Sequence, residues 1–118
     1  MISMIDTVGN ALRNDTALKA LVSTRVYWVR PATAQTQAYI TYIEAANAES
    51  ESADDEEYAD DIEIQVDIFT TGSTIPIARE VQRIMRELGF VHQAMPDLYE
   101  ENTKLIHKPI RFTITKEV

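Results

Sequence analysis

The clearest pattern in the chain is an apolar residue at every second position over residues 62–69. The residues of this segment are Ile62, Glu63, Ile64, Gln65, Val66, Asp67, Ile68 and Phe69. A period of two is typical of a strand that buries one face. Shorter runs rich in β-branched and aromatic residues predict further strands over residues 25–31, 38–45, 90–95 and 104–116.

Apolar residues at helical spacing predict three helices, over residues 3–13, 15–22 and 74–88. Asp15 is a favourable N-cap for the second helix. The third helix carries the longest apolar stripe, and Gly89 follows it as a helix-ending residue.

The predicted element order is ααβββαββ, and no repeat or domain boundary interrupts it. We therefore expect one domain over residues 1–118 with an α+β fold: a mostly antiparallel sheet of four to five strands with helices packed on one face. Residues 49–61 separate two predicted strands. They are expected to form the flexible acidic loop of a long β-hairpin.

Charge is unevenly distributed along the chain. No lysine or arginine lies between Arg30 and Arg79, and that interval holds eleven of the nineteen acids. The flanks carry the eleven bases against eight acids, so a middle of −11 and flanks of +3 give the net charge of −8. Such segregation favours contact between copies, because an acidic surface can face a basic one.

The densest acidic stretch lies in residues 49–61. Its eight carboxylates are Glu49, Glu51, Asp54, Asp55, Glu56, Glu57, Asp60 and Asp61. We interpret this stretch either as a solvated loop that keeps the chain soluble or as a partner-binding surface with Tyr58 as its anchor.

Three arginines, Arg79, Arg83 and Arg86, follow a spacing that places them on one side of the predicted third helix. A solvated helix face is the simpler interpretation. The alternative is an interface with acidic residues of another subunit.

No enzyme motif is evident in the sequence. The chain has no cysteine, its three glycines are scattered, and two histidines, His92 and His107, are too few and too far apart to indicate a zinc site. The acidic stretch has almost no apolar neighbours to raise a carboxyl pKa. We predict no catalytic residues, no metal and no cofactor, and expect Trp28 in the core or at a sheet edge.

The same features resemble the tail-completion proteins of long-tailed bacteriophages and prophages, the group of tail terminators and tail-to-head joining proteins. The matching segments, in chain order, are DTALKALVSTRVYWVRP, AYITYIEA, a polar loop, IEIQVDIFTT, PIAREVQRIMREL and IRFTITKEV. Together they span essentially the whole chain.

The resemblance implies a structural virion protein, made in the host bacterial cytoplasm, at the junction of head and tail. It implies a ring, typically hexameric, that caps the tail tube and contacts the tail tube protein and the head–tail connector proteins. DNA would pass through the ring without specific binding, since like charges repel over a Debye length of ~8 Å. No membrane contact is implied.

Two other interpretations stay open at this point. An acidic inhibitor that mimics DNA would bind the basic groove of a host DNA-binding enzyme, although most mimics hold their charges on rigid elements. A small hydrolase with a carboxylate site is the weaker alternative.

Overall fold

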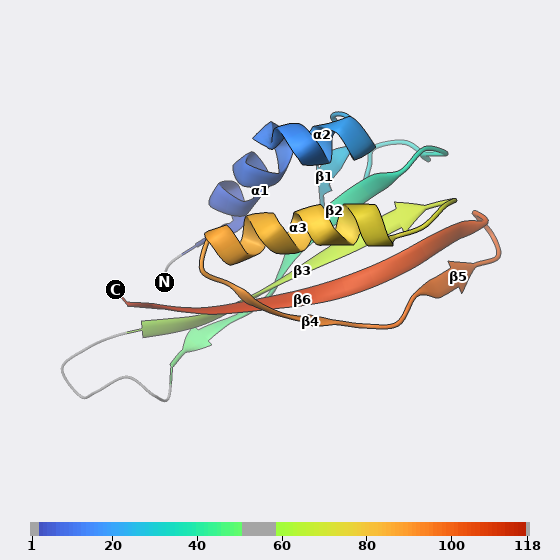
Figure 1. Cartoon of the computed structure of the whole chain (residues 1–118). Coiled ribbons are helices and arrows are strands. Elements are labelled where there is room, and N and C mark those ends of the chain that lie inside the picture. Colours follow the sequence, from blue (N-terminus) through green and yellow to red (C-terminus); the bar gives the residue numbers. More distant parts are fainter. Residues whose placement is uncertain (1–2, 51–58, 118) are drawn as a thin grey trace.

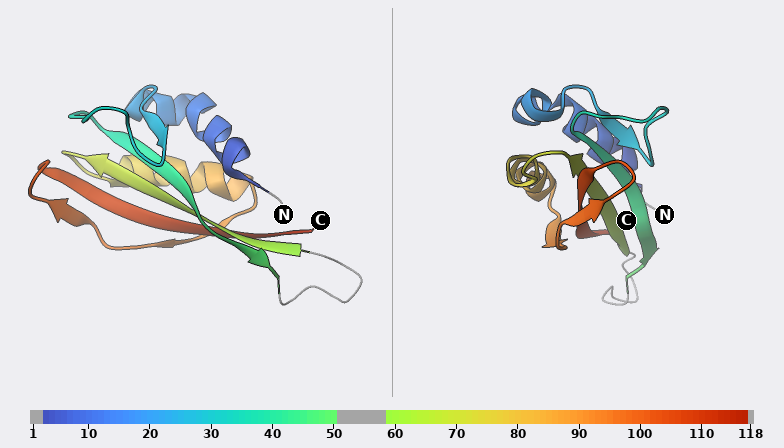
Figure 2. Two further views of the ribbon diagram at one scale, coloured as in Figure 1. Left: turned by 180° about the vertical axis from the view of Figure 1, so that it is seen from behind. Right: turned by 90° about the vertical axis from the view of Figure 1, so that its right-hand side faces the viewer.

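Three helices pack against one six-stranded sheet in the computed structural model, which describes residues 3–50 and 59–117 (Figure 1). The elements are α1 Ile5–Asn14, α2 Thr16–Val22, β1 Val26–Trp28, β2 Tyr39–Glu49, β3 Ala59–Thr70, α3 Ile75–Glu87, β4 Val91–Ala94, β5 Leu98–Glu100 and β6 Leu105–Glu117. The helices gather over one side of the sheet (Figure 2). The predicted α+β class and helix layer are confirmed.

The sheet has the order β1-β2-β3-β6-β4, and β5 also pairs with β6. Every pairing is antiparallel except that of β1 with β2. The described residues form six strands, against the four to five predicted. A three-residue strand such as β5 is too short to display a periodic pattern.

The alternating segment is the central strand, β3, and its buried face meets the helices. Ile64, Val66 and Ile68 are fully buried there, together with Ile110 and Phe112 of the neighbouring β6. Helix-spaced residues of α1, α2 and α3 complete this core, among them Val8, Leu12, Leu18, Val22, Val81 and Met85. The apolar periods of the sequence therefore mark the interface between the two layers.

Both strands of the acidic hairpin are longer than the sequence predicted. β2 continues to Glu49 and β3 begins at Ala59, with Glu49 paired to Asp60 and Ala48 to Asp61. Three of the eight carboxylates thus lie on strands, and the loop expected over 49–61 is shorter at both ends. Pairing of β3 with β6 along its whole length supports this extension despite the polar residues.

Close packing fixes α1 on the sheet at Gly9. A β-carbon at this position would overlap the hydroxyl of Tyr42, a buried residue of β2. That hydroxyl accepts a 2.6 Å hydrogen bond from Arg13, whose guanidinium also lies 5.4 Å from the Tyr42 ring centre. The absence of a side chain at Gly9 lets helix and strand approach.

The end of α3 directs the chain into β4. Gly89 adopts a φ of 100°, a conformation that L side chains rarely adopt. Its N–H donates to the Arg86 carbonyl, and the Phe90 N–H donates to the Met85 carbonyl. This hydrogen-bond pair is the Schellman motif, and it confirms Gly89 as the residue that ends the helix.

Candidate assembly surfaces

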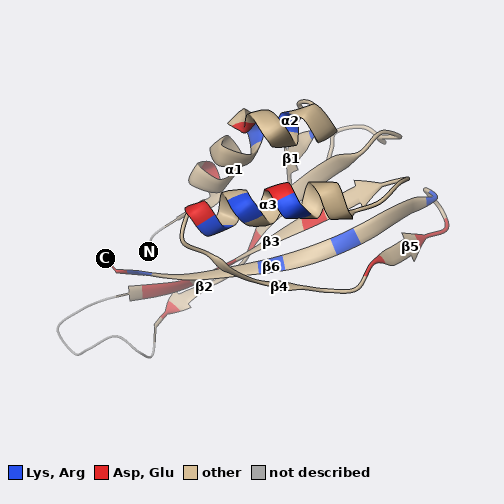
Figure 3. Ribbon diagram, in the orientation of Figure 1, with Lys and Arg blue, Asp and Glu red and all other residues tan. Residues whose placement is uncertain are grey.

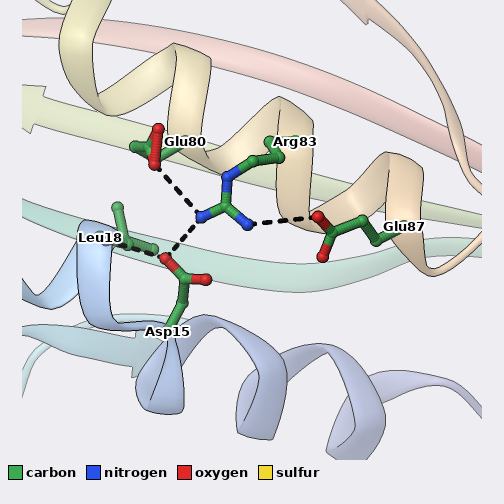
Figure 4. Close-up of polar contacts among 5 residues, drawn as sticks. All are labelled: Asp15, Leu18, Glu80, Arg83 and Glu87. Carbon is green, nitrogen blue, oxygen red and sulfur yellow. Dashed lines mark hydrogen bonds and ion pairs between the residues drawn. The ribbon is translucent and has the colours of Figure 1, made fainter.

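Arg83 of α3 forms ion pairs within its own helix and with the start of α2. Its guanidinium lies 2.7 Å from an Asp15 carboxylate oxygen, 3.2 Å from Glu80 and 3.4 Å from Glu87 (Figure 4). Asp15 also caps α2, accepting a 2.9 Å hydrogen bond from the Leu18 N–H. Arg83 therefore links the start of α2 to the middle of α3.

The electrostatics of this contact agree with its geometry. The hydrogen bond from Arg83 lowers the pKa of Asp15, against the opposing effect of burial, and the Leu18 N–H lowers it further. The carboxylates of Asp15 and Glu80 raise the pKa of Arg83 above its ordinary value. Arg83 is thus engaged within the subunit, which leaves it less available to a neighbour than the sequence suggested.

The other two arginines of the stripe, Arg79 and Arg86, are exposed. The basic positions of α3 are blue in Figure 3. Among residues 3–50 and 59–117, neither Arg79 nor Arg86 has a carboxylate within ion-pair distance. The stripe therefore divides into one intramolecular cation and two that face solvent.

The described part of the acidic stretch lies at one end of the sheet, beyond the helix layer (Figure 3). Asp61 accepts a 2.6 Å hydrogen bond from the Thr115 hydroxyl, and Glu49 lies opposite Asp60 across the hairpin. Like charges opposite each other destabilise a strand pair. The remaining predicted contact residues, Glu51, Asp54, Asp55, Glu56, Glu57 and Tyr58, lie outside the described residues.

A shallow groove of about 520 Å³ crosses the sheet near this acidic end. Small side chains of β2 and β6, including Ala46, Ala48 and Thr115, line it beside the carboxylates of Asp61 and Glu63. Glu63 is paired with Arg111 at 3.2 Å, and Asp61 with Thr115. Asp61 and Glu63 are therefore already paired, and they lie on an open surface. Acid–base chemistry needs a carboxyl group whose pKa is raised by removal from water, and these two groups lack that environment.

Both histidines contact aromatic rings. His107 stacks on Phe69 with ring centres 4.4 Å apart, and its Nε2 lies 2.6 Å from the Asp67 carboxylate. His92 lies tilted against Phe112 at 6.1 Å. Within the described part of the chain, no three His, Asp or Glu side chains are grouped closely enough to hold a metal ion.

The ring stack extends across the sheet. Phe69 stacks on Tyr39 at 4.6 Å, and Tyr39 meets Tyr27 edge to face at 6.1 Å. Burial raises the pKa of the Tyr39 hydroxyl, and the charge of Glu100 adds to the effect. These four rings pack against one another, and each of them is half-buried.

Sequence patterns did not reveal that the apolar residues of β4 and β5 are exposed at a sheet edge. Every residue from Val91 to Tyr99 is exposed, and so are Trp28 and Val29 at the other edge. Residues 91–99 show no regular alternation of apolar and polar positions, which was the available signal, but short strands and exposed loops share this feature. Trp28 lies at a sheet edge, one of the two places expected for it.

No helix within the described residues is long and apolar enough to cross a membrane.

Comparison with known proteins identifies the family. The family model Tail completion protein gp17 matches residues 7–116. A chain from a solved structure described as the virion of a native gene transfer agent (GTA) particle has a similar fold, with a TM-score of 0.72. The two chains are 18% identical, and the match covers 94% of this chain and 92% of that one. No curated protein sequence matches. The chain belongs to the tail completion protein gp17 family, whose members are structural proteins of the virion tail.

Proposed function

We propose that the chain is a ring-forming subunit that caps the tail tube and helps join the tail to the head. The observation that carries this proposal is the separation of charge on one small molecule. The acidic end of the β2–β3 hairpin extends beyond the helices (Figure 3). Arg79 and Arg86 of α3 are exposed. Opposite charges on different faces favour head-to-tail contacts, and such contacts close into rings when the rotation between copies permits.

The proposed partners are further copies of the chain, in a hexamer, together with the tail tube protein and the head–tail connector proteins. Contacts with them are made through protein surfaces alone. The acidic hairpin faces a neighbouring subunit, the tube end or the lumen. In the lumen it would repel passing DNA rather than bind it.

Depletion and restoration test this function. Particles made without the chain should accumulate as separate heads and tails in electron micrographs, and added wild-type protein should restore joined particles. A deletion strain that still yields joined, infectious particles would reject the joining role. Tail tubes mixed with the purified chain should carry a ring at one end, and bare tube ends would reject the capping role.

A further inference from the structure

The segment from Val91 to Glu100 forms one edge of the sheet. β4 pairs with β6 from Thr113 to Ile110, the Met95 N–H bonds to the Pro109 carbonyl, and β5 pairs with β6 further along. Because β3 occupies the other side of β6, β4 and β5 act as one edge strand interrupted at Pro96.

The β4 part of this edge lacks the usual protection of a free strand. Exposed edges normally carry charged residues that prevent pairing with another chain. No charged residue lies between Val91 and Met95. Val91 is 67% exposed, Leu98 52% and Tyr99 62%. Side chains on both faces of β4 are exposed, so its apolar residues stabilise little within the subunit.

The opposite edge of the sheet has a similar exposed apolar group. β1 is the last strand there, and Trp28 is 61% exposed and Val29 48%. The pairings place Trp28 in one row with Ala94 across the sheet, through residues of β2, β3 and β6. Leu98 and Tyr99 pair with His107 and Ile106 of β6, so they lie three and four positions along the strand from the level of Trp28.

Charges at the two edges are complementary. Residues 24–43, around β1, contain Arg25 and Arg30 and no acid. Residues 91–104, around β4 and β5, contain Asp97, Glu100 and Glu101 against the single base Lys104. Asp97 is engaged with Lys108 at 3.2 Å, so Glu100 and Glu101 supply the negative charge at the end of β5. Arg30 is exposed and can reach an acidic partner.

We propose that the β1 edge of one copy of this chain docks on the β4–β5 edge of a second copy, with Trp28 and Val29 against Leu98 and Tyr99. This inference rests on the proposed ring function and names the contact that builds the ring. β1 runs opposite to β4 and β5, so copies in one orientation present an antiparallel pair of edges, and a shift of about four residues along the strands brings Val29 opposite Leu98 and Trp28 opposite Tyr99. A contact between different edges of the same subunit is heterologous and can close a ring.

Disulfide trapping tests the contact, because the chain has no cysteine of its own. In Val29→Cys/Leu98→Cys, the two positions lie on edges separated by three strands, on the order of 19 Å at the usual strand spacing. A disulfide needs Cα atoms within about 7 Å, so it cannot form inside one subunit. Under oxidation, tails assembled with this variant should give a ladder of covalent multimers that ends at the ring size.

The control pairs Leu98→Cys with Ala17→Cys, an exposed position on α2 away from the β1 edge. It should give no ladder. Tails that contain the Val29→Cys/Leu98→Cys chain without a ladder would overturn the contact and leave the joining function standing. A cross-link other than a disulfide that joins Leu98 to a tail tube protein would assign the edge to another partner. That result would also overturn the contact between copies.

A charge exchange decides the question if the double-cysteine chain fails to enter tails. Arg30→Glu should reduce particle joining, and Glu101→Arg in the same chain should restore it, because the exchange re-forms the pair between copies. Wild-type joining by Arg30→Glu alone would overturn the contact. Failure of wild-type protein to restore joining would reject the proposed function instead.

Discussion

The helix-covered face of the sheet and the β4–β5 edge contain apolar residues of the same kinds in opposite environments. Ile64, Val66 and Phe112 have almost no exposed surface beneath the helices, whereas Val91, Leu98 and Tyr99 each expose more than half of theirs. The covered face accounts for the stability of the subunit. The edge contributes little to it, so its apolar residues are explained by contacts outside the subunit.

The largest effect on folding is expected from Gly9→Ala. In an ordinary helix this change stabilises by up to about 1 kcal/mol. Here the new methyl group overlaps the buried Tyr42 hydroxyl, and overpacking of this kind costs about 1–3 kcal/mol. Chemical denaturation should therefore show a net loss of stability. Gly72→Ala is the control, since no atom lies within 4 Å of its β-carbon position; a stable Gly9→Ala would refute the close packing of α1.

Asp15→Ala should cost about 1 kcal/mol through loss of the helix cap, measured by the free energy of unfolding. Asp15→Asn separates the two roles, because asparagine caps well but carries no charge for Arg83.

The pH dependence follows from the lowered pKa of Asp15. A depressed folded pKa gives stability that is present above the ordinary value of 3.8 and is lost as pH falls through the folded pKa. The advantage of wild type over Asp15→Asn should therefore be full at neutral pH and should vanish in acid. An advantage that persists in acid would show that the ion pair is not its source.

Charge reversal along α3 should separate folding from assembly. Arg83→Glu places a fourth carboxylate beside Asp15, Glu80 and Glu87, so we expect a lower melting temperature. Arg79→Glu/Arg86→Glu removes two exposed cations and should leave melting unchanged while it impairs particle joining. Normal joining by this double variant would exclude Arg79 and Arg86 from the interface.

The smallest effect on folding is expected at the edge. Leu98→Glu replaces an exposed side chain, and surface substitutions of this type change stability by no more than about 0.5 kcal/mol. Thermal melting of the purified chain should match wild type. A large loss of stability would mean that the edge belongs to the core of the subunit after all.

Sequence patterns predicted the layers because long elements repeat their periods. The β3 alternation and the α3 stripe each pack against the other layer, and Asp15 and Gly89 mark helix ends through local hydrogen bonds. These features depend on neighbouring residues alone. The extent of the hairpin strands did not follow, because pairing with the distant β6 carries β3 through polar residues.

The candidate surfaces were predicted less completely for a similar reason. Arg83 meets Asp15 across 68 residues of sequence, so its spacing with Arg79 and Arg86 could not reveal its internal role. The exposed edge residues depend on which strand ends the sheet, and topology decides that. Local sequence patterns predict neither the contact between Arg83 and Asp15 nor the order of the strands in the sheet.

The most direct test of the separation between folding and assembly is particle joining with the Leu98→Glu chain. Tails made without the chain are mixed with heads and with either wild-type or Leu98→Glu protein, and joined particles are counted by electron microscopy. The predicted result is a folded variant that fails to restore joining. Joining equal to that of wild type would contradict an assembly role for the β4–β5 edge.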